Sequence, residues 1–509
     1  MLIFGNQVQR KMAKALKIRA SKLPYQSVNQ LTLAGFESPF SQKLSSTNRW
    51  VLLSNKIPWD QIVGVYDKQM RNGSTGASHI NARVVLGALM IKHMCNLSDE
   101  ETILQIQENM YMQYFIGYSS FSDQAPFDAS LFVEIRKRLG IEQLAAINEQ
   151  IVKLSTKVDK DNDGNEYKEL SSQQPSKEVP GVSEEHFGRL LVDATACPQD
   201  IAYPTDLNIL NDAREKSEQI IDVLFNNLIH PFKKPRTYRE KARKIYLRTA
   251  QKKNKSKNAI RNTIGKQLRF LKRNISHINM LLDGYDSIPL DKRLYKYLLV
   301  IQEAYRQQKQ MWEDKIHTVA HRIVSIHQPH VRPIVRGKER AKTEFGCKIN
   351  VSLVKGYTFI DQLSWDAFNE GTFLKESIEK YKARTGYYPK EVLADKIYCN
   401  RENRKYLKEL GIHLKAKPLG RPSAVNKEHV RPGERNPIEG KFGQAKTAYG
   451  LDRIKARLNR TSESWVASII LVLNLVKLAG EVPFYLIRKI LFFLHRISTI
   501  KKSERLLFQ

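Results

Sequence analysis

Apolar residues recur at helical spacing through the first third of the chain, from about residue 50 to residue 155. In INARVVLGALMIKHMCN the apolar positions form a wide stripe from Val84 to Met94, which is typical of an amphipathic helix. Ser98 followed by Glu101 has the spacing of a capping box and predicts the start of the next helix. ASLFVEIRKRL predicts a further one. We therefore expect an all-helical N-terminal domain over residues 1–155.

This helical domain has two interpretations. Several short amphipathic helices in a basic chain favour a domain for DNA binding or dimerisation. A domain that only packs against its neighbours stays equally open, because no helix stands out as a recognition helix for the major groove.

The pattern changes after residues 156–185, which contain Pro and Gly with almost no apolar side chains and predict a linker. GRLLVDATA then predicts a first strand. Lys348 to Val354 and Tyr357 to Leu363 predict a hairpin that turns at Lys355-Gly356. EVLADKIY and IHLKAKP predict two later strands, each preceded by a helix. Residues 186–480 are thus expected to form an α/β domain, a mixed sheet flanked by helices.

A long helical segment interrupts this sheet after its first strand. Residues 207–332 include KQLRFLKRNISHINMLL and RLYKYLLVIQEAYRQQKQMWEDKIHTVAHRIV, both with helical periodicity. We expect an inserted helical hairpin that projects from the core.

The charge of the chain indicates what kind of partner it binds. The formal net charge is +32, which favours a polyanionic partner and strong salt dependence of binding. The insertion carries an especially one-sided run, which we expect to contact DNA phosphates; the alternative is a solvated helix face. The expected contacts are Lys233, Lys234, Arg236, Arg239, Lys241, Arg243 and Lys244.

The spacing of the cysteines and the length of the apolar segments indicate the cellular compartment. The four cysteines are far apart and form no CxxC pair, so a reducing, cytoplasmic setting is expected. The N-terminus lacks the apolar core and cleavage site of a signal peptide. WVASIILVLNLVKLAG is shorter than the roughly 20 apolar residues of a spanning helix, so we expect a buried core helix. Residues 481–509 form a basic amphipathic tail, suited to partner packing or DNA contact.

Three acids in chain order have the pattern of a two-metal phosphoryl-transfer site. Asp193 and Asp395 each end a short apolar run that predicts a buried strand. Glu439 lies in RNPIEGKFGQAK, where Asn436 and Pro437 are expected to be the N-cap and first residue of a helix. Carboxylates that converge from strand ends and a nearby helix can hold two Mg²⁺ ions.

Each of these acids also has a structural explanation. Aspartates often follow strands as turn residues, and Glu439 could complete a capping box. The set of three is what favours catalysis, since Arg435 and Lys446 flank the glutamate and are placed to hold DNA phosphates. Four other acids lie near the predicted strands and compete with this set. Asp200 and Asp206 are expected to shape a loop or support the site, Asp366 to cap a helix, and Asp361 stays a competitor.

The set resembles the DDE transposases of bacterial insertion sequences, in particular the IS-five-like superfamily. Arg435, Glu439 and Lys446 match that family's Tyr-x2-Arg-x3-Glu-x6-Lys signature, but the tyrosine position is Pro432. VDATACPQDIAYPTDLNILNDARE, VRPIVRGKE and FIDQLSWDAFNEG also resemble the family, as does the helical block from about Trp50 to Leu139.

The resemblance implies an RNase H-like core in which Asp193, Asp395 and Glu439 are catalytic and hold two Mg²⁺ ions, with Mn²⁺ able to substitute. It implies Mg²⁺-dependent cleavage of double-stranded DNA at the element's ends, followed by attack of the freed 3′-OH on target DNA. Arg435, Lys441 and Lys446 are the expected DNA contacts near the site. A homodimer in a synaptic complex and association with the nucleoid are also implied.

Two alternatives of other classes stay open. One is a non-catalytic DNA-binding or architectural protein with a degenerate RNase H-like core. The other is an RNase H-like nuclease without strand transfer. Convergence of the three carboxylates in space would favour the transposase over the first of these.

Overall fold

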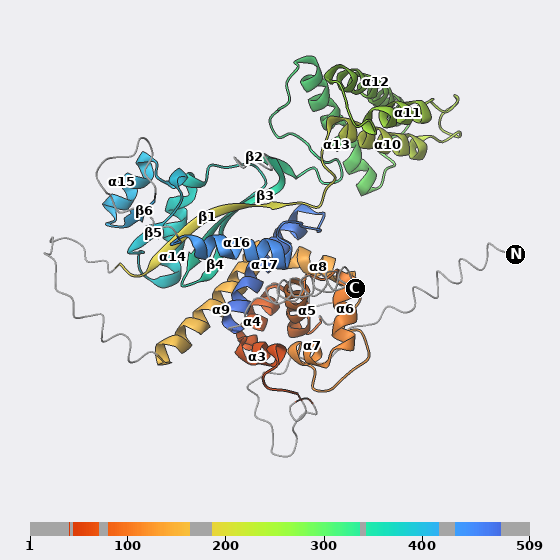
Figure 1. The fold of residues 1–509 in the computed structure, drawn as a ribbon. Coiled ribbons are helices and arrows are strands. Elements are labelled where there is room, and N and C mark those ends of the chain that lie inside the picture. Colours follow the sequence, from red (N-terminus) through yellow and green to blue (C-terminus); the bar gives the residue numbers. More distant parts are fainter. Residues whose placement is uncertain are drawn as a thin grey trace, which may run out of the picture.

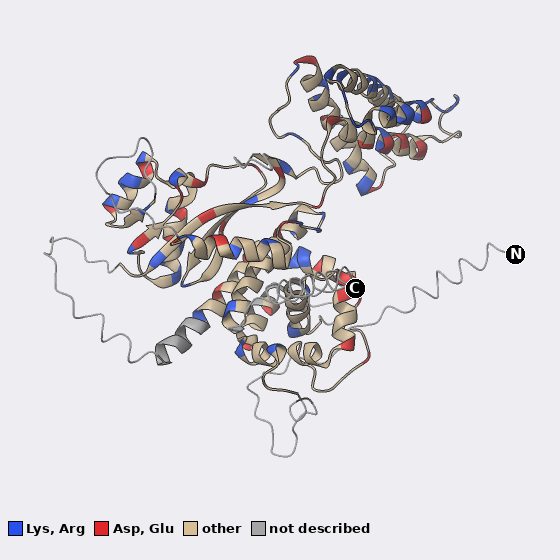
Figure 2. Cartoon of the chain, viewed as in Figure 1, with Lys and Arg blue, Asp and Glu red and all other residues tan. Residues whose placement is uncertain are grey.

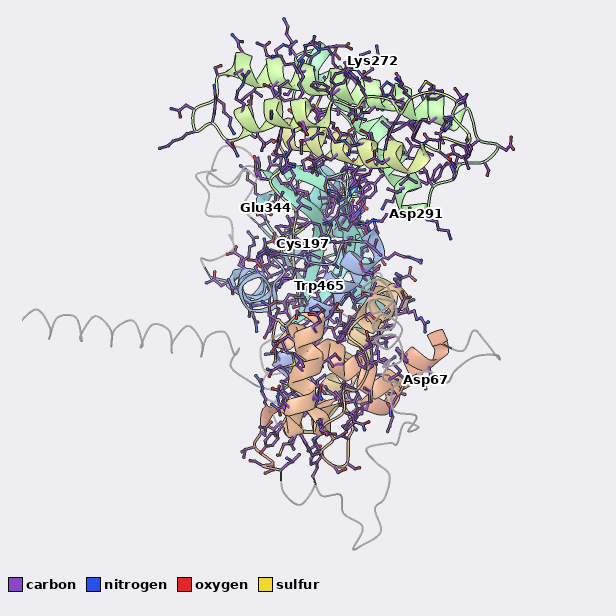
Figure 3. All side chains as sticks on the ribbon, turned by 90° about the vertical axis from the view of Figure 1, so that its right-hand side faces the viewer. Asp67, Cys197, Lys272, Asp291, Glu344 and Trp465 are labelled. Atoms are coloured by element: carbon purple, nitrogen blue, oxygen red, sulfur yellow. The ribbon has the colours of Figure 1, made fainter. Side chains whose placement is uncertain are left out.

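The computed structural model describes Phe40 and residues 44–70, 80–162, 186–335, 343–416 and 433–479. A mixed sheet lies between a group of helices from the N-terminal part of the chain and a second helical group inserted after the first strand (Figure 1). Viewed from the side, these parts form three tiers, with the insertion at one end and the N-terminal helices at the other (Figure 3).

Strand β1 (Arg189–Pro198) is central in the sheet. On one side it pairs antiparallel with β3 (Thr343–Val354), which in turn pairs with β2 (Arg332–Val335) at its start and with β4 (Tyr357–Ser364) along the rest. On its other side β1 pairs parallel with β5 (Glu391–Leu393), and β5 pairs parallel with β6 (His413–Lys415). The predicted mixed α/β sheet is therefore confirmed.

The predicted hairpin is confirmed, together with its turn. Lys355 and Gly356 both have positive φ, 49° and 79°, as a two-residue turn between twisted antiparallel strands requires. The hairpin strand β3 begins at Thr343, five residues before the predicted start, because its first residues pair with β2. Strand β2 was not predicted, since four residues carry too little periodicity to be recognised.

Alternate residues of β1 face two different apolar cores, because successive side chains in a strand point to opposite faces. Leu190 and Val192 pack into one core with helix α14 (Leu374–Thr385). Cys197 faces the other core, which holds α16 (Asn436–Tyr449) and α17 (Asn459–Ala479). Between β5 and β6, helix α15 (Arg401–Glu409) adds Leu407 to the α14 side.

The described chain before the predicted linker is helical, as expected. Ser98 is confirmed as an N-cap: its hydroxyl accepts a hydrogen bond from the Glu101 amide at 3.0 Å. These helices share one apolar core with α16, α17 and the sheet, so they pack directly on the domain that follows. They are α3 (Arg49–Lys56), α4 (Trp59–Met70), α5 (Ala82–Met94), α6 (Asp99–Glu108), α7 (Met110–Phe115), α8 (Leu131–Arg138) and α9 (Ile141–Asn162).

Helix α17 is the one described helix long and apolar enough to cross a membrane, and 83% of that window is buried inside the protein. Its polar Asn474 is completely buried, and both ends of its side-chain amide form hydrogen bonds. The side-chain oxygen accepts from the Thr358 amide at 2.8 Å, and the amide nitrogen donates to Asn148 Oδ1 at 2.8 Å. The prediction of a buried core helix is confirmed, and Asn474 ties α9 to β4 through it.

The insertion differs from the predicted hairpin. It consists of four helices, α10 (Asp206–Leu224), α11 (Arg239–Ala250), α12 (Lys257–Leu282) and α13 (Lys292–Glu313). Residues of α10, α12 and α13 build a core of their own, separate from the two cores on the sheet. A two-helix hairpin would leave this apolar face exposed, whereas the added helix α10 covers it. The hairpin prediction was therefore wrong, although the helical character was right.

Some predictions fall outside the described residues. The linker lies there for residues 163–185, while α9 extends to Asn162, seven residues into the range assigned to the linker. The basic tail 481–509 and Pro432 lie outside the described residues as well.

Candidate active site

Asp193 is the fifth of ten residues in β1, so the strand does not end at it as the sequence had indicated. The prediction failed because Asp193 interrupts the apolar run without interrupting the backbone pairing, which continues to Pro198. By strand alternation, Asp193 shares the sheet face of Leu191 and Cys197, the face covered by α16. Its side chain is 16% exposed.

Asp395 follows β5 by two residues and is the N-cap of a short 3₁₀ helix, Lys396–Tyr398. Its Oδ1 accepts a hydrogen bond from the Lys396 amide at 2.7 Å, which fixes the side chain at the end of the strand. Because β5 runs parallel to β1 and beside it, this end of β5 lies next to the middle of β1. The prediction of a strand-end aspartate is confirmed here.

Glu439 belongs to α16, whose inner face is anchored by Ile438, Phe442 and Ala445 in the core. The helix begins at Asn436 and its N-cap position is Arg435, one residue earlier than predicted. No side chain caps this end, so neither the Asn436 cap nor the capping-box explanation of Glu439 holds. The Glu439 side chain is 59% exposed.

The Arg435 guanidinium lies among all three predicted acids. Its Nη2 is 3.0 Å from Asp193 Oδ2 and 3.9 Å from Glu439 Oε1, while Nη1 is 3.2 Å from Asp395 Oδ1. The carboxylates come from a central strand, a strand end and a helix that are widely separated in sequence. The tertiary structure thus places the three acids around one cation, which was predicted to contact DNA and here contacts carboxylates.

The charges at this site are not fully compensated. Burial raises the pKa of Asp193, and although Arg435 and the Ala194 amide act in the opposite direction, the nearby acids Glu370 and Asp395 add to the rise. Arg435 Nε is buried and has no hydrogen-bond partner within the described residues. The guanidinium therefore compensates the negative charge of the acids only in part, and one of its own N–H donors lacks a hydrogen-bond acceptor.

The donor set suits a hard divalent cation, because carboxylate oxygens are the ligands that Mg²⁺ and Mn²⁺ prefer. Within the described residues, no group of three or more Asp, Glu, His or Cys side chains is arranged to hold a metal in this conformation. The three acids surround Arg435 instead of a shared point. Carboxylate chemistry and convergence fit a metal pair, provided that Arg435 moves.

Two lysines of α16 were predicted to contact DNA. Lys446 is seven residues after Glu439, which places it on the same face of α16 two turns away. Lys441 lies elsewhere on the helix surface: it is half-buried, and burial together with nearby Lys477 lowers its pKa. Because Lys441 lies on a different face of α16 from Glu439, it is less well placed than Lys446 to contact a phosphate bound beside Glu439.

Sequence reasoning missed a neighbouring acid, Glu370, which lies close enough to raise the pKa of Asp193. Glu370 forms an ion pair with Lys348 at 2.8 Å, and both side chains are mostly buried. Behind Asp193, the fully buried Tyr398 hydroxyl donates to Asn350 Oδ1 at 2.8 Å. These residues carry no spacing motif, so only the fold could bring them to the site.

The other candidate acids are each committed elsewhere. Asp361 is buried and accepts from Arg384 and Ser352, and Asp206 accepts from Arg322 and Gln308. Asp200 pairs with Arg453 at 2.9 Å. Asp366 lies near Arg332 and His321 and caps no helix, because the 3₁₀ helix that follows (Glu370–Phe373) is capped by Asn369. The predicted helix cap at Asp366 was wrong.

The basic run of the insertion lies in α11 and just before it, and further Lys and Arg residues mark the neighbouring α12 (Figure 2). Part of it lines an open hollow of 1030 Å³ that includes Arg236, Lys241 and Lys244. Two of the predicted phosphate contacts share one carboxylate within the fold, since Lys234 and Arg239 both pair with Asp222 at 2.8 and 2.9 Å. These two contribute less free positive charge than their sequence suggested.

A second basic surface was not foreseen. A groove of 1000 Å³ runs between α13 of the insertion and the core, at the end of β1. Four cations from both walls have no ion-pair partner within the described part of the chain: Lys292, Arg293, Lys296 and Arg457. A fifth, Lys137, pairs with Glu134. Arg293 and Arg457 both lower the pKa of His327, behind the larger effect of burial, so the two walls lie close together there.

Comparison with known proteins gives two family matches. Residues 392–476 match the family described as "Transposase DDE domain", and residues 38–138 match "Transposase domain (DUF772)". The first segment contains Asp395, Arg435 and Glu439; Asp193 lies outside both segments. The second covers the helices from α3 to α8.

A curated protein of Rhizobium meliloti, "Uncharacterized protein ORF8 in nfe locus", is 31% identical over 159 residues. The match covers 31% of this chain and 64% of that protein, so the chain spans less than two thirds of this relative. No solved structure matches the chain.

Proposed function

We propose that this chain, a member of the DDE transposases, cleaves DNA at the ends of an insertion sequence and joins the freed 3′-OH to target DNA. One observation carries the proposal: Asp193, Asp395 and Glu439, from three separate elements, all contact the same guanidinium. A cluster of three carboxylates is costly unless it is compensated, which favours a functional reason for the arrangement.

Asp193, Asp395 and Glu439 would hold the divalent cations. When bound, two such ions activate an attacking water or hydroxyl and stabilise the leaving oxygen of the phosphodiester. Asp193 supplies a fixed position, because it lies within β1 where that strand pairs with Val351 of β3. Asp395 and Glu439 are more than half exposed, so they face the side from which DNA would approach.

The sheet is then an RNase H-like catalytic core. The support for this is the adjacency of the acid-bearing elements: β1 and β5 are parallel neighbours, and α16 packs across the face that carries Asp193. Lys446, on the same helix face as Glu439, would hold a phosphate next to the scissile one.

Removing divalent cations is expected to abolish cleavage while leaving DNA binding. Nicking of a plasmid that carries the DNA flanking the gene is compared in excess chelator, in Mg²⁺ and in Mn²⁺, and binding is followed by gel shift. Cleavage only in the two metal buffers supports the proposal. Cleavage in excess chelator contradicts it; cleavage without strand transfer favours the nuclease alternative, and tight binding with no cleavage favours the architectural one.

DNA held at the three acids would also reach the groove beside α13. The groove begins near Asp200, which is seven residues beyond Asp193 and so about 20 Å along the strand direction. That distance corresponds to roughly six base pairs of duplex at 3.4 Å each. The unpaired cations on both walls would contact the phosphates of this stretch, so the insertion and the core would hold the DNA together.

Replacing Arg293 and Arg457 with alanine is expected to weaken DNA binding by a salt-dependent amount. Each lost phosphate contact should make the slope of log affinity against log salt shallower by about one. Lys309→Ala, on the same helix α13 but paired with Glu313, serves as the matched control and should leave the slope unchanged. Equal slopes for the double variant and the wild type, measured by fluorescence anisotropy, would rule out this DNA path.

A further inference from the structure

We propose that Arg435 is a gate that controls metal binding at the three acids. In the DNA-free protein its guanidinium pairs with the three carboxylates, and when DNA binds, the guanidinium leaves them and pairs with a DNA phosphate instead. This inference rests on the proposed function, since it takes the three acids as the metal ligands. It assigns to Arg435 a positioning role beyond that of a phosphate contact.

Arg435 occupies the space between the three acids. The Arg435 guanidinium contacts Asp193 at 3.0 Å and Asp395 at 3.2 Å, and lies 3.9 Å from Glu439. It therefore lies between the three carboxylates that would hold the metal ions. A metal pair bridging these acids would bring positive charge against a guanidinium only a few ångströms away, so the two cannot share the position at low cost.

The guanidinium stabilises the DNA-free state. Three carboxylates in a partly buried cluster repel one another, and the Asp193 side chain is only 16% exposed. One cation among them relieves that repulsion and keeps Asp395 and Glu439 drawn towards the sheet. Without Arg435 the acids would attract another cation from solution.

Arg435 can leave the three acids. It stands at the N-cap position of α16, directly after a turn that begins at Gly433 with φ of 102°. Its Nε has no partner within the described residues, so the present position does not satisfy all of its donors. The two non-bridging oxygens of a phosphodiester can accept a pair of hydrogen bonds from a guanidinium, as the two oxygens of a carboxylate do.

The consequence is an order of events. Without DNA, Arg435 competes with divalent cations for the acids. With DNA, a phosphate near the site draws the guanidinium away, and the acids become free to bind metal. DNA and metal should therefore bind with positive coupling, which must be reciprocal in their affinities.

The test measures Mn²⁺ affinity by electron paramagnetic resonance, with and without a short duplex, after subtraction of Mn²⁺ bound by the duplex alone. We expect weak binding by the free wild-type protein and binding tighter by on the order of tenfold with DNA, as competition with a full charge implies. Arg435→Ala should bind Mn²⁺ tightly without DNA, with little further gain on adding it. Arg435→Lys keeps the positive charge, so its Mn²⁺ binding without DNA should remain weak.

Arg453→Ala is the matched control, because it removes an arginine that pairs with the exposed Asp200 instead of the three acids. It should behave as wild type. Circular dichroism verifies that each variant is folded. If Arg435→Ala is not folded, the wild-type protein still tests the proposal, because equal Mn²⁺ affinity with and without DNA would overturn the gate. Equal Mn²⁺ affinity for Arg435→Ala and wild type without DNA would overturn the gate.

The gate and the proposed function fail in different ways. Asp193→Asn in the Arg435→Ala background removes a proposed ligand without restoring the competing cation. If this change leaves Mn²⁺ affinity intact, the acids are not the ligands, and the proposed function falls together with the gate. If it lowers the affinity but Arg435→Ala alone had no effect, only the gate is wrong.

Discussion

Asp193→Asn is expected to lower DNA cleavage and strand transfer by about 10³-fold or more, with DNA binding largely retained. The substitution keeps the shape of the side chain but removes the charge that would hold a divalent cation. Metal ions contribute several kcal/mol to transition-state stabilisation, and each 1.36 kcal/mol corresponds to a tenfold change in rate. Asp395→Asn and Glu439→Gln should have effects of the same order. Cleavage rates on end-containing DNA and gel-shift affinities measure the two parts separately.

Asp200→Asn provides the matched control for these variants. Asp200 lies just beyond the same strand β1 and pairs with Arg453, away from the three acids. Cleavage by this variant should stay within a few-fold of wild type. Full activity in all three acid variants, or an equal loss in Asp200→Asn, would show that these acids are not the catalytic set.

Asp99→Ala is expected to lower the free energy of unfolding by about 3–5 kcal/mol, the cost of breaking a buried ion pair by removing one partner. Asp99 lies 2.9 Å from Lys92 and 2.7 Å from Arg136, whose side chains are only 1% and 5% exposed. Both cations lie over the Trp465 ring of α17, so the cluster connects the N-terminal helices to the last one. Chemical denaturation followed by tryptophan fluorescence measures the loss.

Glu134→Ala is the control for this prediction, since Glu134 pairs with Lys137 on the surface, where an ion pair contributes about 0–1 kcal/mol. The pH dependence gives a second measurement. Burial opposes ionisation of Asp99, but the Arg136 hydrogen bond and the Lys92 charge outweigh it and lower its pKa. Its contribution is therefore present above the ordinary pKa near 3.8 and lost as pH falls through the lowered value. If the free energy of unfolding falls with decreasing pH in the same way for the wild type and for Asp99→Ala, this prediction is contradicted.

The sequence predicted the elements best where one residue decides a local structure. The Ser98 cap, the Lys355-Gly356 turn and the buried helix α17 follow from side chains that act on their own neighbours. Long-range packing was harder to foresee. The insertion was expected as a hairpin because helix periodicity shows that a face is apolar, but not how many helices are needed to cover it.

The candidate site shows the same division. Asp193, Asp395 and Glu439 could be proposed from residue type, order and flanking cations, because two-metal chemistry requires carboxylates. The role of Arg435 could not, since its sequence position beside Glu439 also suited a phosphate contact. Its distances to Asp193 and Asp395 depend on a helix and two strands meeting across the sheet.

By itself, the sequence determined which segments are helical or extended, which acids and cations are available, and that the chain is strongly basic. These are properties of single residues and of local periodicity. Only the tertiary structure decided that three distant carboxylates surround Arg435 and that two basic walls form a groove beside α13. The physical reason is that such electrostatic interactions depend on distances between elements far apart in the chain, and packing of the shared cores sets those distances.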